Sequence, residues 1–250
     1  MKPPVRVGVF GARGRMGQRI IACAEARADC EIVYTLDANT ENGHLSACEV
    51  LIDFSLPEAT DGLVQSLAAC KAGLVTGVTG RSETQQSLVT DLASNRPVFA
   101  AANFSIGIAV LNHLITQAVT ALGPDFDTEV FEIHHRAKAD APSGTALQLA
   151  ATAAAARGLP WPDSRRNRDG HTGAREPCEI GTAALRGGTV AGEHTVFLFG
   201  DSERLELTHR ATDRDVFAIG ALRAAVWLAR KSPGLYSMVD LVQNTTGQRS

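Results

Sequence analysis

Short apolar runs alternate with longer segments of helical repeat along the first 105 residues. A run of four to eight apolar residues between turn residues is typical of a buried strand, and apolar residues that recur every three or four positions are typical of a helix with one buried face. Their alternation predicts a parallel, doubly wound sheet. The expected strands are 5–10, 31–36, 48–54, 74–80 and 97–100, and the expected helices are 15–27, 57–72 and 82–94.

The pattern changes after residue 105, where a long helix with an apolar face is expected to end at Gly123-Pro124. Glycine pairs and polar turn residues separate the later β segments, which predicts hairpins and antiparallel strands. These strands should extend the strand at 128–133 into an open mixed sheet. The expected elements are helices at 106–122, from the Pro142-Ser143-Gly144 start to about 157 and at 216–230, and strands at 128–133, 180–186, 189–199 and 204–210.

Composition narrows the class of protein. The net charge is −3 with 20% charged residues, which argues against a general nucleic-acid or membrane-surface binder. We find no apolar run long enough to span a bilayer and no signal-peptide pattern, so we expect a cytoplasmic protein, or a stromal one if a plastid leader has been removed. The five cysteines form no C-x-x-C pair, which suits reduced thiols and argues against a zinc or disulfide framework.

A glycine-rich turn, Gly11-Ala12-Arg13-Gly14-Arg15-Met16-Gly17, joins the first expected strand to the first helix. Such a turn lets a pyrophosphate approach the backbone at a helix N-terminus. Asp37 ends the second strand about 20 positions later, where an acid accepts the ribose hydroxyls. The G-x-x-G-x-x-G spacing is a weak signal alone, but the flanking strand, helix and acid favour dinucleotide binding over a merely structural turn.

Ligands of doubly wound sheets lie at the carboxyl ends of the strands, although small residues there also simply close tight loops. Ala38 follows Asp37 at a position where an NADP-preferring protein often has a cation for the 2′-phosphate, so we expect NADH to be used at least as well as NADPH. Arg13 or Arg15 could still neutralise that phosphate. The expected cofactor-binding residues are Gly11, Ala12, Arg13, Gly14, Arg15, Met16, Asp37, Gly77, Val78, Thr79, Ala101, Ala102, Asn103 and Phe104.

The polar loop after the strand at 128–133 combines histidines, cations and a helix start. Pro142 fixes its own φ where the helix begins, and Asp140 or Ser143 can cap the helix. The backbone N–H groups at Gly144 and Thr145 would then favour a carboxylate or phosphate. The alternative is an ordinary polar surface loop with a common helix start.

These observations predict an α/β protein of two domains. The first, residues 1–105 and 216–250, is expected to be a Rossmann-type dinucleotide-binding domain to which the helix at 216–230 returns. The second, residues 106–215, is expected to be an α+β domain that binds substrate and mediates oligomerisation, because one helix layer leaves a sheet face or edge for another subunit. Residues 40–47 are unpatterned, and 160–179 form a long loop of the kind that is usually functional or disordered.

The assembled motifs resemble the 4-hydroxy-tetrahydrodipicolinate reductase family over nearly the whole chain. The family implies NAD(P)H-dependent reduction of a cyclic imine-type dicarboxylate in lysine and diaminopimelate synthesis, by a homotetramer whose two domains close by hinge motion. The resemblance rests on the glycine turn, Ala101-Ala102-Asn103-Phe104-Ser105, His134-His135-Arg136-Ala137-Lys138-Ala139-Asp140-Ala141-Pro142-Ser143-Gly144-Thr145-Ala146-Leu147 and Gly192-Glu193-His194-Thr195.

The same resemblance implies roles for single residues and no metal. His134 and Lys138 match the family's proton donors, His135 matches a contact to a substrate carboxylate, and Gly144-Thr145 matches a second carboxylate site. Two departures stand out. The segment between Asp37 and Cys48 is shorter than in many members and is expected to lack a helix and a strand, and Val78 stands where many members have Thr.

Three rival interpretations remain. An aspartate- or homoserine-type dehydrogenase would share the fold but would not need the histidine loop. A non-catalytic nucleotide sensor would be expected to have lost His134 or Lys138, and this chain has both. A metal site of His134, His135 and His171 lacks the ligand spacing of zinc or iron sites.

Overall fold

The computed structural model describes residues 3–37, 40–160 and 164–246. The chain forms two compact units: the first comprises Met1–Ile106 and Asp215–Ser250, and the second comprises Gly107–Arg214. Among the described residues, no helix is long and apolar enough to cross a membrane.

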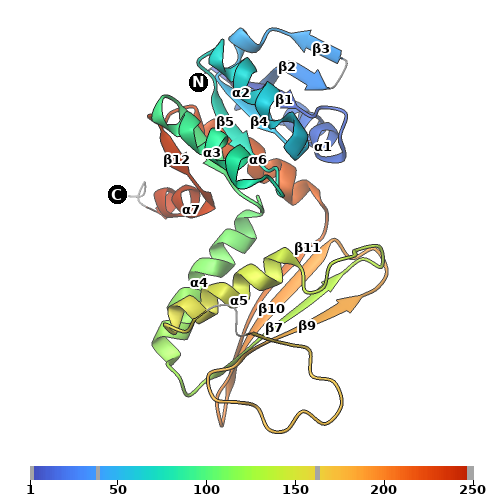
Figure 1. The fold of residues 1–250 in the computed structure, drawn as a ribbon, viewed down its shortest axis with the longest axis vertical. Helices are drawn as coiled ribbons and strands as arrows, with labels where there is room; N and C mark the ends of the chain where they lie inside the picture. Colours follow the sequence, from blue (N-terminus) through green and yellow to red (C-terminus); the bar gives the residue numbers. More distant parts are fainter. Residues whose placement is uncertain (1–2, 38–39, 161–163, 247–250) are drawn as a thin grey trace. The chain divides into compact units, whose positions relative to one another are not determined.

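The first unit is built on a seven-stranded sheet in the order β12-β6-β5-β4-β1-β2-β3, in which every pairing except β2 with β3 is parallel. This confirms the doubly wound sheet (Figure 1). Its strands are β1 (Val5–Phe10), β2 (Cys30–Asp37), β3 (Thr40–Gly43), β4 (Val50–Asp53), β5 (Gly73–Thr76), β6 (Pro97–Ala100) and β12 (Gly234–Tyr236). Its helices are α1 (Arg15–Glu25), α2 (Thr60–Ala68), α3 (Glu83–Asp91), α6 (Asp215–Leu228) and α7 (Met238–Thr246).

The central strands of this sheet are buried on both faces. Every residue of β4 and β5 is buried, as expected of parallel strands covered by helices on either side. Leu63 of α2 and Val89 of α3 join Leu51 and Leu74 of these strands in one core cluster. Helix α6 contacts β1, β4, β5 and β6, so the C-terminal helix does return to the first sheet.

Two parts of this unit differ from the sequence-based expectation. Residues 40–43 form an antiparallel edge strand, β3, followed by a 3-10 turn at Leu45–Ala47, where we expected no pattern and no strand. The strand is polar and largely exposed, so it carries no apolar alternation that would reveal it. Residues 234–246 hold a further strand, β12, and a helix, α7, beyond the helix that we expected to be last. A strand of three residues is too short to show a period.

The second unit is a five-stranded mixed sheet in the order β11-β10-β7-β9-β8, covered on one face by two helices (Figure 1). Ile115 of the first helix and Leu149 of the second pack on Val130 and Val196 of the sheet. The open mixed sheet is therefore confirmed. The elements are α4 (Ile106–Leu122), β7 (Asp127–His134), α5 (Gly144–Ala156), β8 (Ser164–Arg166), β9 (Ile180–Arg186), β10 (Gly192–Phe199) and β11 (Arg204–Ala211).

The strand order of this sheet corrects one predicted hairpin. Strands β10 and β11 form the expected hairpin, closed by Gly200 N donating to Glu203 O at 2.8 Å. Strands β9 and β10 do not pair, because β7 lies between them, parallel to β9 and antiparallel to β10. Gly187 N instead donates to His134 O at 2.9 Å, so the glycine pair after β9 supports the end of β7.

In the described part of the segment 160–179, ion pairs connect the chain to β7. Residues 164–166 form strand β8 beside β9, which the sequence did not predict. Arg168 donates to Glu129 of β7 at 2.8 Å, and Arg175 donates to Asp127 at 2.6 Å. The cations of the segment thus attach it to β7.

Candidate active site

The glycine turn after β1 is shaped for close approach to the backbone. Gly11 has φ +80°, and a Cβ there would lie 3.0 Å from Phe54 O. A Cβ at Gly17 would lie 2.2 Å from Gly11 O, so the turn packs directly on the first turn of α1. Gly14, the N-cap of helix α1, has an extended conformation and no side chain to cap the helix. The open helix N-terminus suits a pyrophosphate.

Asp37 is joined to this turn by a hydrogen bond. Its Oδ2 accepts from Arg13 N at 2.7 Å, while Gly11 N donates to Leu36 O at 2.9 Å. The carboxylate at the end of β2 is therefore held beside the turn, where it suits a ribose hydroxyl. The glycine turn and Asp37 therefore both suit a dinucleotide. Ala38 lies outside the described residues, so the expectation that rests on it stays a prediction.

The other predicted cofactor residues follow neighbouring parallel strands. The Gly77–Thr79 loop follows β5, and the Ala101–Phe104 loop follows β6, so both lie at the same sheet edge as the glycine turn. Phe104 itself is 2% exposed and packs against Phe54 with ring centroids 5.4 Å apart. Its side chain thus supports the loop from the core and is not presented at the surface.

Phe54, just after β4, is a site residue that the sequence did not single out. A Cβ on Gly77 would lie 2.4 Å from its ring, and its carbonyl lies against Gly11. It therefore separates the two loops at the point where the strand order reverses between β1 and β4, which is where doubly wound sheets bind ligands.

A buried ion pair between Arg81 and Asp53 stabilises the Gly77–Thr79 loop. Arg81 Nη2 lies 2.8 Å from Asp53 Oδ2, and the two side chains are 3% and 0% exposed. Arg81 also donates to Thr76 Oγ1 at 3.0 Å and to Val78 O at 3.4 Å. The loop's conformation thus rests on a side-chain network, with Val78 contributing its backbone.

In the second unit, Ser143 starts helix α5 as predicted. Its side chain accepts from Ala146 N at 3.2 Å, and Leu147 N makes the first full-turn bond to Ser143 O at 3.0 Å. Gly144 is exposed, Thr145 is half-buried, and nothing lies within 4 Å of a Cβ built on Gly144. The first N–H groups of a helix of 13 residues thus face an accessible site with a positive dipole end.

His134 is oriented by Glu132, two residues earlier on the same face of β7. His134 Nδ1 is hydrogen-bonded to Glu132 Oε2. Glu132 is fully buried and also accepts from Arg186 at 2.8 Å and from Ser143 N at 3.1 Å. Burial alone would raise the pKa of Glu132, but the hydrogen bonds from Arg186 and His134 outweigh it and hold the pKa below its usual range.

His194 of β10 lies on the other side of this group. Its ring is 5.1 Å from that of His134 at an interplanar angle of 76°, and its Nε2 is 3.2 Å from Ser143 Oγ. Burial, assisted by the nearby His134, lowers the pKa of His194 to about 4. His194 is therefore a neutral histidine at physiological pH, and it supports the N-cap of α5.

Two more cations, Lys138 and Arg214, contact residues of the loop between β7 and α5. Lys138 Nζ forms an ion pair with Asp140 Oδ1 at 2.8 Å, which lowers the pKa of Asp140. Asp140 thus binds Lys138, and Ser143 alone caps the helix. His135 Nε2 lies 2.9 Å from Arg214 Nη2, and partial burial together with that guanidinium lowers the pKa of His135.

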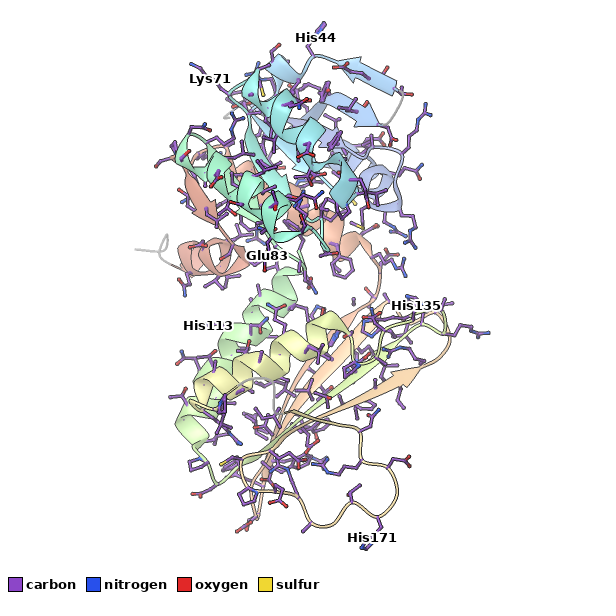
Figure 2. All side chains as sticks on the ribbon, in the orientation of Figure 1. His44, Lys71, Glu83, His113, His135 and His171 are labelled. Atoms are coloured by element: carbon purple, nitrogen blue, oxygen red, sulfur yellow. The ribbon has the colours of Figure 1, made fainter. Side chains whose placement is uncertain are left out.

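The three histidines of the metal-site alternative do not converge. Figure 2 shows His135 and His171 at opposite ends of the second unit. Within the described residues there is no group of three or more His, Cys, Asp or Glu side chains arranged to hold a metal ion.

Comparison with known proteins establishes the family. Residues 5–104 match the family described as Dihydrodipicolinate reductase, N-terminus, and residues 107–242 match Dihydrodipicolinate reductase, C-terminus. The chain belongs to the dihydrodipicolinate reductase family. Its glycine turn and its histidine loop therefore lie in the two matched parts of one family.

Individual relatives agree. The 4-hydroxy-tetrahydrodipicolinate reductase of Sulfurimonas denitrificans is 43% identical over 254 residues, which covers 96% of this chain and 99% of the relative. That of Caulobacter vibrioides is 42% identical, covering 97% and 98%. A solved dipicolinate-bound dihydrodipicolinate reductase from Paenisporosarcina sp. TG-14 shares the fold, with a TM-score of 0.73, 22% identity and coverage of 94% and 97%.

An engineered D-amino acid dehydrogenase bound to NADP+ also shares the fold, at a TM-score of 0.54, 14% identity and coverage of 99% and 100%. The fold is thus one that accommodates a nicotinamide cofactor. The relatives are oxidoreductases, and this family membership favours a reductase over an aspartate- or homoserine-type dehydrogenase and over a nucleotide sensor.

Sequence reasoning gave no role to Glu132, Arg186 or His194. The spacing of Glu132 and His134 on an alternating strand could have revealed their contact, since residues i and i+2 share a face. Arg186 pairs with His134 across β9 and β7, and His194 pairs with Glu132 across β10 and β7. Only the strand register brings these side chains together, and the register was not predictable.

Proposed function

We propose that this protein reduces 4-hydroxy-2,3,4,5-tetrahydrodipicolinate to tetrahydrodipicolinate with NADH or NADPH, in the diaminopimelate pathway of lysine biosynthesis. One observation carries the proposal: a Glu132-oriented His134 shares a loop with Lys138 and the capped N-terminus of α5, in a chain of this family. A proton donor beside an anion site is the arrangement that reduction of a dicarboxylate requires.

The first unit would hold the cofactor. The bound cofactor supplies a hydride to a ring carbon of the substrate. The open start of α1 suits the pyrophosphate, and Asp37 suits the ribose hydroxyls. The remaining contacts are proposed for Gly11, Ala12, Arg13, Gly14, Arg15, Met16, Gly77, Val78, Thr79, Ala101, Ala102, Asn103 and Phe104, with Phe104 acting through loop support.

The second unit would hold the substrate. The N–H groups of Gly144 and Thr145, at the positive end of α5, suit one carboxylate. His135, with Arg214 beside it, suits the other. A dicarboxylate bound in this way would be oriented at both ends, and orientation lowers the entropic part of the barrier.

The proton that follows the hydride would come from Lys138, aided by His134. Lys138 is held by Asp140 at 2.8 Å, and its side chain is 22% exposed. Negative charge that builds on the conjugated ring is then met by a positioned general acid, which contributes typically about 10²–10⁴-fold. Arg136 adds positive charge to the same loop, and Arg186 of β9 donates to the backbone oxygen of Asp140 in that loop.

The proposal includes a cofactor preference. Asp37 accepts from Arg13 N and would accept from a ribose 2′-hydroxyl, while a 2′-phosphate would meet its negative charge. We therefore expect NADH to be used at least as well as NADPH. Steady-state kcat/KM values for both cofactors test this, and a strong preference for NADPH would show that Arg13 or Arg15 controls the choice instead.

The function is tested by following NADH and NADPH oxidation by the purified protein. The substrate is the product of the condensation of pyruvate with aspartate semialdehyde, formed in the same cuvette, and the control omits the condensing enzyme. Turnover that depends on the condensation and is unaffected by a chelator supports the proposal. No turnover with either cofactor, but oxidation of aspartate or homoserine, would favour the rival dehydrogenase.

We also propose that the protein is a homotetramer assembled through the sheet of the second unit. That sheet carries helices on one face. Leu185 of β9 is 53% exposed and lies on the other face, because it pairs with Ile133 of β7, whereas Val130 of β7 packs on the helices. Light scattering on the eluted protein should give a mass of about four times 26.4 kDa. A Leu185→Glu variant should give smaller species, and a wild-type monomer would contradict the proposal.

A further inference from the structure

We infer that Glu132 and Arg186 are a positioning pair that sets the tautomer and the charge of His134 and ties the two proposed proton donors to the start of α5. This inference rests on the proposed function, because it assigns His134 a part in proton delivery. Neither residue would touch the substrate in order to act, and both would work through His134 and the loop.

The contacts of Glu132 carry the inference. Its Oε2 is hydrogen-bonded to His134 Nδ1 and accepts from Arg186 Nη1 at 2.8 Å. Its Oε1 accepts from Arg186 Nη2 at 2.8 Å and from Ser143 N at 3.1 Å. A fully buried carboxylate with four donors around it is compensated and rigid. It therefore offers His134 one fixed acceptor.

This acceptor determines which nitrogen of His134 carries the proton. An ionised carboxylate can only accept, so Nδ1 must donate, and neutral His134 keeps its lone pair on Nε2. Protonated His134 then carries its exchangeable proton on Nε2, and the Glu132 charge stabilises that form. Gly192 lies under this nitrogen: a Cβ there would be 3.0 Å from Nε2. A side chain at Gly192 would therefore crowd that nitrogen.

Arg186 works against Glu132 on the same histidine. Its guanidinium shares Oε2 with His134 and withdraws part of the negative charge. It faces His134 directly from β9 in the strand register. The two partners should thus have opposite effects on the proton of His134. The titratable and charged groups around His134 are Glu132 on β7, Arg186 on β9, His194 on β10, and His135, Lys138 and Asp140 in the loop.

Arg186 also reaches the second proposed donor. Its Nη2 donates to the backbone oxygen of Asp140, whose carboxylate holds Lys138 Nζ at 2.8 Å. Glu132 is connected to α5 through Ser143 N. One network thus links His134, Lys138 and the anion site, and a change at Arg186 should be felt at both donors.

Substitutions at the two positions make opposite predictions for the pH profile of kcat/KM. Glu132→Gln removes the charge that stabilises protonated His134, so the alkaline limb should move to lower pH by about one unit. At pH 8 this displacement should lower the rate by up to about tenfold. Arg186→Met removes the opposing charge, so the limb should move to higher pH. Arg186→Lys keeps the charge and should leave the limb within a few tenths of a unit of wild type.

A merely structural role for the pair would lower the rate without moving the limb, or would move it in the same direction in both variants, and either result would overturn the inference. Circular dichroism of each variant identifies a loss of fold. If Glu132→Gln does not fold, the opposite displacement in Arg186→Met still decides the matter.

Nitrogen-15 NMR of histidine-labelled protein gives a readout that needs no turnover. Comparison with a His134→Gln variant assigns the signals. Neutral His134 should be protonated at Nδ1, and the pH at which it loses its proton should fall in Glu132→Gln and rise in Arg186→Met. Protonation at Nε2, or equal midpoints in all three proteins, contradicts the inference. If the midpoints move as expected in a protein that oxidises neither NADH nor NADPH, the proposed function alone fails.

Discussion

The glycine turn after β1 and the loop after β7 both lie where a strand leads into a helix, but they are made from different parts of the chain. The turn is made of backbone: a Cβ at Gly17 would lie 2.2 Å from Gly11 O, and Arg13 and Arg15 point into solvent. The loop is held by side chains, above all by Glu132, which is fully buried. The two sites should therefore respond to substitution in different ways.

A site built from backbone should lose its fold and its ligand binding when an added side chain fills its space. It should tolerate changes in the charge of nearby side chains. A side-chain-built site should keep its fold when a partly exposed member such as Lys138 is truncated, and should lose function or gain a new pH dependence. The first follows from close packing, and the second from the cost of leaving a buried polar group without its partners. Three substitutions separate these behaviours.

The largest effect is expected for Gly17→Val. Its side chain would meet the backbone of Gly11 and Ala12, with the nearest atom 2.2 Å from the Cβ, and backbone cannot move aside as a side chain can. We expect a loss of more than about 3 kcal/mol in the free energy of unfolding, together with loss of cofactor binding. Urea unfolding and quenching of tryptophan fluorescence by NADH measure the two effects.

Gly62→Ala is the matched control, because Gly62 lies inside α2 and nothing lies within 4 Å of a Cβ built there. The free energy of unfolding of this variant should rise by about 1 kcal/mol, because alanine has a higher helix propensity than glycine, and NADH binding should be normal. Equal stability of the Gly17→Val and wild-type proteins would show that the turn is not packed as described.

His194→Gln should reveal the pH dependence of the second site. The unfolded chain takes up a proton on His194 near pH 6.5 and the folded chain only near pH 4, so protonation favours unfolding as the pH falls through this window. Wild type should lose about 2 kcal/mol of unfolding free energy between pH 7 and pH 5 from this group. The variant should lack that part of the loss. Urea unfolding at pH 7 and pH 5 measures it, and an equal loss of unfolding free energy in wild type and variant would contradict the assignment.

Ser143→Ala should destabilise the protein by about 1 kcal/mol through loss of the cap of α5. Ser82→Ala is the control, since the Ser82 side chain caps α3 in the first unit by accepting from the N–H three residues later, as Ser143 does in α5. Ser143→Ala should lose more stability than Ser82→Ala, because His194 Nε2 also loses its partner. Only Ser143→Ala should raise KM for the dicarboxylate. An unchanged KM in Ser143→Ala would separate the start of α5 from substrate binding.

The same contrast explains what the sequence could predict. The glycine turn, Asp37 and the five strands β1, β2, β4, β5 and β6 follow from local patterns, and the structure has these five strands in the expected places. The cap at Ser143 was also predictable, since it depends on residues three positions apart. The order of β7, β9 and β10 was not predictable. A glycine pair after a strand does not reveal whether the next strand pairs with it or is separated from it by a third strand, as β10 is separated from β9 by β7.

The network around Glu132 shows why this limit matters for function. Arg186 and Glu132 are 54 positions apart, and Ser143 and His194 are 51 apart. Their contacts depend on parallel and antiparallel pairing within one mixed sheet, which no local period encodes. Strand β3 and strand β12 were missed for a simpler reason: one is polar and one is three residues long.

The most direct test of the account is the kinetics of Lys138→Ala, measured with substrate from the coupled condensation and with the cofactor Kd determined by fluorescence. Lys138 belongs to the side-chain-built site, and its Nζ forms an ion pair with the exposed carboxylate of Asp140. We expect kcat to fall about 10²–10⁴-fold while the cofactor Kd and the unfolding free energy stay within about twofold and 0.5 kcal/mol of wild type. Near-normal turnover with an unchanged pH profile would contradict the account.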